Sequence, residues 1–82
     1  MGTARRRPQP KRMAGKLLAI RKKLGLSQTQ MAKHLKLRKA YTVISSYERG
    51  TREPDLLTLL RYARFAKIPL ETLVDDSIKL PE

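Results

Sequence analysis

Residues 25–50 read GLSQTQMAKHLKLRKAYTVISSYERG and carry the clearest signals of local structure in the chain. Ser27 is placed to cap a helix, because its hydroxyl can accept an exposed backbone N–H of the next turn, and Gln30 stands at the capping-box position. The apolar stripe that follows has helical spacing and consists of Met31, Ala32 and Leu35. This part of the stretch therefore predicts a short helix that begins after Ser27.

A second short helix is predicted over about Tyr41 to Arg49. Ile44 and Tyr47 lie three residues apart and face one way, which predicts that both pack inward, and Gly50 is a strong C-terminal stop. Residues 36–40 show no clear period. Two short helices joined by a brief linker are the arrangement of a helix-turn-helix, in which the second helix can enter the major groove of DNA.

The flanking sequence predicts three more helices and no strand. The first, Met13–Leu24, is closed by a left-handed Gly25. The fourth is capped by Asp55, and a short fifth helix is predicted over Leu70–Val74. Their apolar faces are expected to consist of Met13, Leu17, Ile20 and Leu24, then Leu56, Leu59, Leu60, Ala63 and Ala66, and finally Leu73 and Val74. The predicted fold class is an all-α five-helix domain, divided into a flexible basic arm (1–12), the helical domain (13–76) and a C-terminal tail (77–82).

Composition narrows the function. The 82 residues carry 19 Lys and Arg against 7 Asp and Glu, a net charge of +12, and no acid precedes Glu48. Because the first half of the chain carries almost only positive charge, it predicts a partner rich in phosphates. The alternative is a basic surface with no binding role. With no Cys and the single His34, no metal and no cofactor are expected, and no apolar run is long enough to cross a membrane. The four glycines never cluster and no nucleophile–base–carboxylate set is visible, so an enzyme is not expected.

The chain resembles the Cro and phage-repressor (lambda-repressor-like) type of helix-turn-helix domain, also called the xenobiotic-response-element type. The resemblance covers about residues 17–74. It rests on Gly25-Leu26-Ser27-Gln28, Met31-Ala32-Lys33-His34-Leu35, Ile44-Ser45-Ser46-Tyr47-Glu48-Arg49-Gly50 and Arg52-Glu53-Pro54. It implies a bacterial or phage-type transcriptional regulator, acting in the cytoplasm at the nucleoid, that binds double-stranded DNA and acts as a repressor.

Candidate DNA contacts follow from this arrangement. The second helix of the pair, about Tyr41 to Arg49, is the one expected to enter the major groove and is here called the recognition helix. Base contacts are predicted for the polar side chains on its outward face, which are Tyr41, Thr42, Ser45 and Ser46. The resemblance implies phosphate contacts by Gln28, Thr29, Arg49, Thr51 and Arg52, with Gln28 alternatively bracing the recognition helix. It also implies a structural pair between Arg21 and Glu48.

The linker departs from the family pattern. Eight residues separate Leu35 from Ile44, where the family usually has about six, and Ala40 stands where a Ser or Thr cap is favoured. Either the recognition helix begins earlier or residues 36–39 form an irregular basic loop. The insertion places Lys36, Arg38 and Lys39 where they are candidates for further phosphate contacts.

Three wider expectations complete the hypothesis. The arm residues Arg5, Arg6 and Arg7, with Lys11 and Arg12, either reach into a minor groove or form a solvated tail. Asp75 and Asp76 are expected to keep their face off the DNA. The apolar residues Leu70, Leu73, Ile78 and Leu80 exceed what the core needs and predict a homodimer on a palindromic operator, with recognition helices about 34 Å apart. The alternatives are an antitoxin-type protein that binds a toxin partner and a nonspecific RNA- or ribosome-associated protein.

Overall fold

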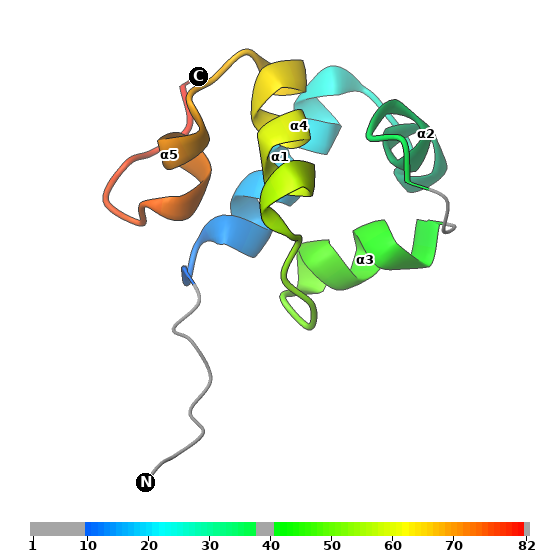
Figure 1. Cartoon of the computed structure of the whole chain (residues 1–82), viewed down its shortest axis with the longest axis horizontal. Coiled ribbons are helices and arrows are strands. Elements are labelled where there is room, and N and C mark those ends of the chain that lie inside the picture. Colours follow the sequence, from blue (N-terminus) through cyan, green and yellow to red (C-terminus); the bar gives the residue numbers. More distant parts are fainter. Residues whose placement is uncertain (1–9, 38–40, 82) are drawn as a thin grey trace, which may run out of the picture.

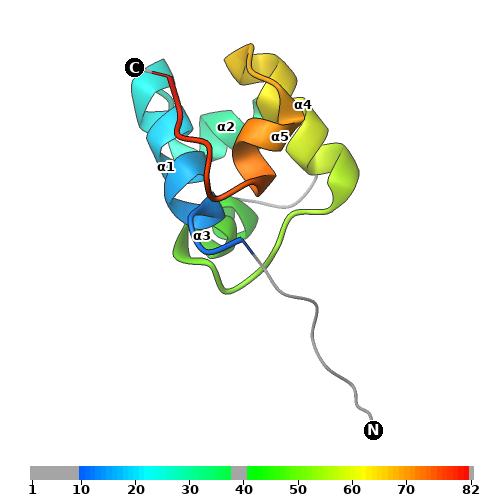
Figure 2. The same cartoon turned by 90° about the vertical axis from the view of Figure 1, so that its left-hand side faces the viewer.

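A computed structural model describes residues 10–37 and 41–81, and the side chain of Tyr41 lies outside the described part. The helices are α1 (Met13–Leu24), α2 (Gln28–His34), α3 (Tyr41–Arg49), α4 (Leu56–Ala66) and α5 (Leu70–Val74). In Figure 1, helices α1 and α4 occupy the middle, with α2 and α3 on one flank and α5 on the other, and Figure 2 looks at the molecule from the α5 flank. The predicted all-helical class is confirmed, and no strand occurs in the two described ranges.

The predicted N-terminal caps are confirmed. The Ser27 hydroxyl accepts the Gln30 N–H at 3.1 Å, and the Gln30 side chain returns a bond to the Ser27 N–H at 2.8 Å, which completes a capping box. The Asp55 carboxylate accepts the Thr58 N–H at 2.8 Å. The hydrogen bonds that this carboxylate accepts from the backbone and the side chain of Thr58 lower the pKa of Asp55. The stabilisation by this cap is therefore present above the ordinary Asp pKa and is lost as the pH falls through the lowered folded-state value.

Four helices end in the same left-handed motif. After α1, the Gly25 N–H bonds to Lys22 O and the Leu26 N–H to Arg21 O, with φ of 71° at Gly25. Gly50 closes α3 in the same way with φ of 77°. At the ends of α2 and α4 the left-handed residue is a lysine, Lys36 (φ 59°) and Lys67 (φ 61°). The two lysine ends were not predicted, because the sequence shows no glycine there.

Lys67→Gly is expected to raise the free energy of unfolding by about 0.5–1 kcal/mol, because glycine adopts a positive φ without the Cβ penalty. Thermal unfolding checks this gain. Gly25→Ala is the matched opposite, since it introduces a Cβ at φ 71° with no heavy atom within 4 Å, and it should destabilise by a similar amount through the backbone alone. A loss of stability in Lys67→Gly would contradict this account of the helix end.

The core draws residues from all five helices. Its fully buried members include Leu17, Met31, Ile44, Tyr62 and Leu73. The predicted inward packing of Ile44 and Tyr47 is confirmed, with exposed fractions of 0% and 7%. Val43 is also buried, so α3 grips the domain through three side chains rather than two.

Several apolar predictions were wrong. Leu24, Val74 and Leu56 are exposed by 40%, 40% and 70%, because each lies at a helix end where the stripe turns away from the other helices. Tyr62, which the predicted stripe omitted, occupies the centre of α4's buried face instead. Leu73 belongs to the core, and Leu70 and Leu80 pack partly against it, so these leucines are not a surplus.

Lys16 is the unexpected member of the interior. It is 6% exposed, and its ammonium donates to Thr72 O at 2.6 Å and to Asp75 O at 2.9 Å. These carbonyls lie at the C-terminal end of α5, where the last acceptors of a helix have no partner within it, and Lys16 satisfies them. The buried ammonium of Lys16 thus fastens α5 to α1. None of the described helices is long and apolar enough to cross a membrane.

Candidate nucleic-acid interface

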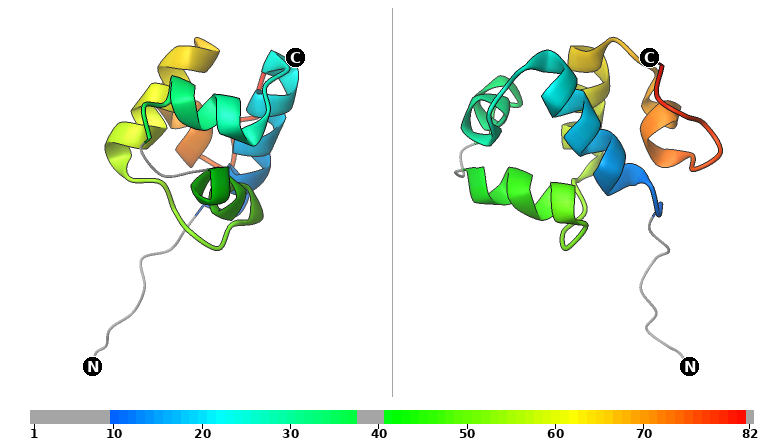
Figure 3. Two further views of the ribbon diagram at one scale, coloured as in Figure 1. Left: turned by 90° about the vertical axis from the view of Figure 1, so that its right-hand side faces the viewer. Right: turned by 180° about the vertical axis from the view of Figure 1, so that it is seen from behind.

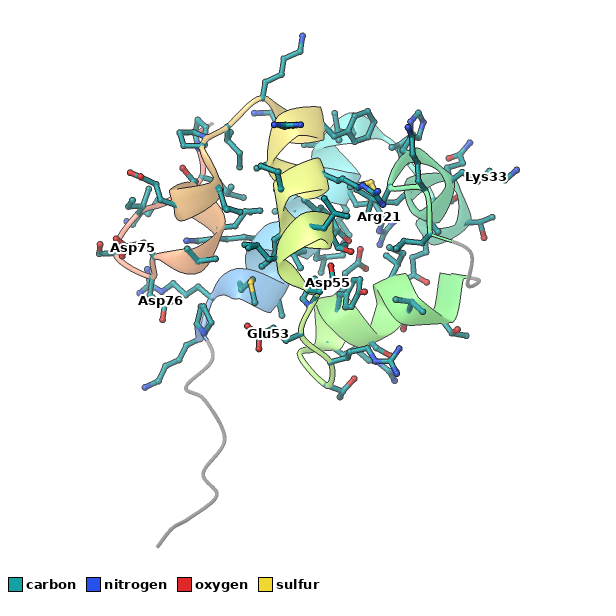
Figure 4. The ribbon with its side chains drawn as sticks, viewed as in Figure 1. Arg21, Lys33, Glu53, Asp55, Asp75 and Asp76 are labelled. Atoms are coloured by element: carbon teal, nitrogen blue, oxygen red, sulfur yellow. The ribbon has the colours of Figure 1, made fainter. Side chains whose placement is uncertain are left out.

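Helix α3 presents a row of small polar side chains away from the core. Thr42 and Arg49 are exposed and Ser45 and Ser46 are half-buried, while the side chains between them turn inward. The helix lies along one edge of the molecule in both views of Figure 3. Asp75 and Asp76 lie beside α5, on the other flank from α2 and its labelled Lys33 (Figure 4). The outer face of α3 is therefore accessible and set apart from this acidic pair.

The C-terminal end of α3 is tied to the loop that follows it. Ser46 O accepts the N–H groups of Thr51 at 3.0 Å and Arg52 at 3.3 Å, and the Thr51 hydroxyl at 3.3 Å. The Ser46 hydroxyl donates to Thr42 O at 3.1 Å. The side chains of Arg49, Thr51 and Arg52 are exposed around this junction. Two cations and a hydroxyl thus stand at one end of the polar row.

A three-residue network fixes α3 against α1 and α2. The Arg21 guanidinium donates to the two oxygens of Glu48 at 2.6 and 3.1 Å, and the Gln28 amide donates to Glu48 Oε1 at 3.1 Å. Arg21 also donates to Leu26 O at 2.9 Å. The side chain of Glu48 is 4% exposed, and its bond to Arg21 raises the pKa of that guanidinium. A paired, nearly buried carboxylate therefore sets the orientation of α3.

The remaining candidate residues fall into three groups. Thr29, in the first turn of α2, and Lys36, just after α2, are exposed. Gln28 is half-buried and uses its amide on Glu48, which is the bracing alternative for this residue. The other candidates lie outside the described residues: Arg5, Arg6, Arg7, Arg38, Lys39 and the Tyr41 side chain.

Two sets of long-range contacts had no signal in the sequence. Arg61 of α4 donates to Leu35 O at 3.0 Å and so holds the end of α2. The Asp76 carboxylate accepts the backbone N–H groups of Lys11 at 2.9 Å and Arg12 at 3.0 Å. Partners more than 25 positions apart follow no local pattern, so sequence spacing could not reveal them.

A metal ion would require several ligand groups close together among the titratable residues of the described ranges. No group of three or more His, Cys, Asp or Glu that could hold a metal ion occurs there. The His34 ring stacks on Phe65, with ring centroids 4.6 Å apart. The chemistry on offer is recognition by hydroxyls and cations.

The fold and this surface define a helix-turn-helix domain, and comparisons with known proteins give its family. The family model described as Helix-turn-helix (HTH_3) matches residues 17–73. The chain therefore belongs to the Cro/C1-type helix-turn-helix family, whose members are DNA-binding transcriptional regulators. The resemblance seen in the sequence is confirmed.

Solved structures with the same fold agree. The P22 c2 repressor, crystallised with a synthetic operator, is 26% identical with a TM-score of 0.70, over 78% of this chain and 94% of that one. The S. venezulae BldD DNA-binding domain is 34% identical with a TM-score of 0.63, over 79% and 94%. The restriction-modification controller protein C.AhdI from Aeromonas hydrophila is 27% identical with a TM-score of 0.65, over 76% and 91%. A search of curated proteins found no match.

Proposed function

We propose that this protein is a sequence-specific repressor that inserts α3 into the major groove of double-stranded DNA, acting at the nucleoid in the cytoplasm. The observation that carries the proposal is the outward hydroxyl row of α3, held from behind by the Arg21–Glu48–Gln28 network. A major groove about 12 Å wide admits one helix. The P22 c2 repressor, of the same fold, was crystallised on an operator.

Base readout falls to Thr42, Ser45 and Ser46, with Tyr41 as the fourth candidate. The Ser46 proton is directed to Thr42 O, which leaves the oxygen's lone pairs as acceptors. The hydrogen-bond donors that bases expose in the major groove, and that such an acceptor can contact, are the amino groups of cytosine and adenine. Ser46 therefore favours these bases at its position in the operator.

Phosphate contacts flank the helix at both ends. Arg49, Thr51 and Arg52 serve the C-terminal end, and Thr29, Lys36, Arg38 and Lys39 serve the α2 side, where the linker is long. The arm residues Arg5, Arg6 and Arg7 add minor-groove contacts. Each protomer neutralises roughly 4 to 6 phosphates, which gives a slope of log K against log salt of about −4 to −5.

Two copies are proposed to bind together on a palindromic operator. The flank that carries α5 leaves α3 free on another edge, so a two-fold axis beside α5 keeps both recognition helices toward the DNA (Figure 1). Val74 is exposed and Leu70 and Ile78 are half-buried on this flank, whereas Leu73 is inside the core. Selection of bound duplexes from a random pool tests this arrangement, because a dimer enriches inverted half-sites one helical turn apart. Single, unrepeated sites would contradict it.

Two substitutions separate reading from holding. Ser46→Ala is expected to weaken binding to the selected operator by about 1 kcal/mol and to change binding to a random duplex little, because it removes only an outward-facing hydrogen-bond acceptor. Arg52→Ala is expected to weaken both duplexes alike and to reduce the salt slope by about 1. Anisotropy titrations at several salt concentrations measure both effects. Equal behaviour of the two variants, a flat salt dependence of the natural chain, or equal affinity for random RNA would each contradict the proposal.

A further inference from the structure

The start of α1 lies beside the loop that follows α3. A cleft of about 270 Å³ separates them, with Pro10 and Lys11 on one wall and Arg52 and Glu53 on the other. The side chains of Lys11 and Arg52 are both exposed, and two bases face one acid among the lining residues. The exposed cation of Lys11 thus shares a cleft with Arg52, a residue of the proposed phosphate-binding end of α3.

The backbone on the Lys11 wall is held by a residue from the other end of the chain. Asp76 accepts the Lys11 and Arg12 N–H groups through its two oxygens, at 2.9 and 3.0 Å. Helix α1 has no acidic residue in its first turn and no side-chain cap from Arg12, so this distant carboxylate supplies the anchor. Figure 4 shows Asp76 between the end of α5 and the start of α1. Such ionic hydrogen bonds are stronger than neutral ones and restrict where Lys11 can lie.

We infer that Lys11 and Arg52, on opposite walls of this cleft, jointly bind the phosphate backbone of DNA. We further infer that Asp76 is a positioning residue for DNA binding. The inference rests on the proposed function and extends it. It assigns Lys11 to a phosphate beside α3 rather than to a minor groove. It also gives Asp76 a role opposite to the one expected from its charge, which was to keep DNA away.

The sign of the Asp76 effect distinguishes positioning from bulk electrostatics. Removing an acid from a DNA-binding protein normally strengthens binding, because the net positive charge rises. Asp76→Asn removes the charge and one of the two acceptors, so the Lys11 segment is released and binding weakens. Glu71→Gln is the matched control, since Glu71 is exposed on α5 and its only described bond is through its backbone carbonyl.

The test uses the full chain and a random-sequence duplex, titrated by anisotropy between about 50 and 200 mM salt. Lys11→Ala is expected to lower the salt slope by about 0.9, which reduces the loss of affinity over this range by about 3.5-fold. Asp76→Asn is expected to weaken binding about threefold and to lower the slope as well. Lys67→Ala, which removes a cation at the far end of α4, leaves the slope unchanged. Thermal melts confirm that each variant is folded at the temperature of the titration.

The outcomes separate the inference from the proposed function. An unchanged slope in Lys11→Ala, beside a lowered slope in Arg52→Ala, overturns the cleft as a phosphate site while DNA binding stands. Tighter binding by folded Asp76→Asn, as in Glu71→Gln, overturns the positioning role. A flat salt dependence of the unsubstituted chain overturns the proposed function itself.

Discussion

Glu48→Ala is expected to cost about 3 kcal/mol of the free energy of unfolding. The substitution leaves the Arg21 guanidinium, 15% exposed, and the Gln28 amide without the carboxylate that both now contact. Removing one member of a buried ion pair is far more costly than removing the whole pair, because the remaining charge stays desolvated. A domain of this size is stable by only about 4–12 kcal/mol, so chemical denaturation should show a large loss.

Two companion variants give this prediction its control. Glu71→Ala removes an exposed carboxylate and is expected to change stability by less than about 0.5 kcal/mol. Arg21→Met with Glu48→Leu removes both charges and should be more stable than Glu48→Ala alone. If Glu48→Ala unfolds at the same denaturant concentration as Glu71→Ala, the network contributes nothing to the free energy of unfolding.

Tyr62→Ala is expected to cost about 3–5 kcal/mol, because it opens a cavity at the centre of the core. Tyr62 is fully buried, and none of the described residues accepts its hydroxyl proton. Burial raises the pKa of this hydroxyl, so the group stays protonated and its donor remains unsatisfied. Thermal or denaturant unfolding measures the loss.

Tyr62→Phe separates the ring from the hydroxyl. The ring is retained and the unsatisfied donor is removed, so this variant is expected to match or exceed the natural stability. A loss of more than about 1 kcal/mol in Tyr62→Phe would mean that the hydroxyl has a partner. Together the two substitutions test whether α4 is held by shape alone at this point.

The helices could be predicted because their ends are encoded locally. The two residues of each N-terminal cap are close in sequence, Ser27 with Gln30 and Asp55 with Thr58. The turns that follow α1 and α3 are indicated by Gly25 and Gly50. The ends at Lys36 and Lys67 could not be foreseen, since a lysine adopts the left-handed conformation only when the surrounding packing imposes it. Helical spacing predicted a stripe on α4 that included Leu56 and omitted Tyr62, whereas the core buries Tyr62 and leaves Leu56 exposed.

The candidate site was predictable where it follows the helix period and not where it depends on distant partners. The outward row at Thr42, Ser45 and Ser46 follows from the inward turn of Ile44 and Tyr47. The family resemblance pointed to the Arg21–Glu48 pair, which the structure joins at 2.6 Å. The bonds from Lys11 and Arg12 to Asp76 span more than sixty positions, and only folding brings those groups together.

The burial of Lys16 has a consequence for how the domain comes apart. Five residues of helix cannot persist alone in water, because nucleation is costly and few internal bonds reward it. Helix α5 exists only while Leu73 is inserted and the ammonium of Lys16 closes its last turn. Fraying of this segment and its detachment are therefore a single cooperative event.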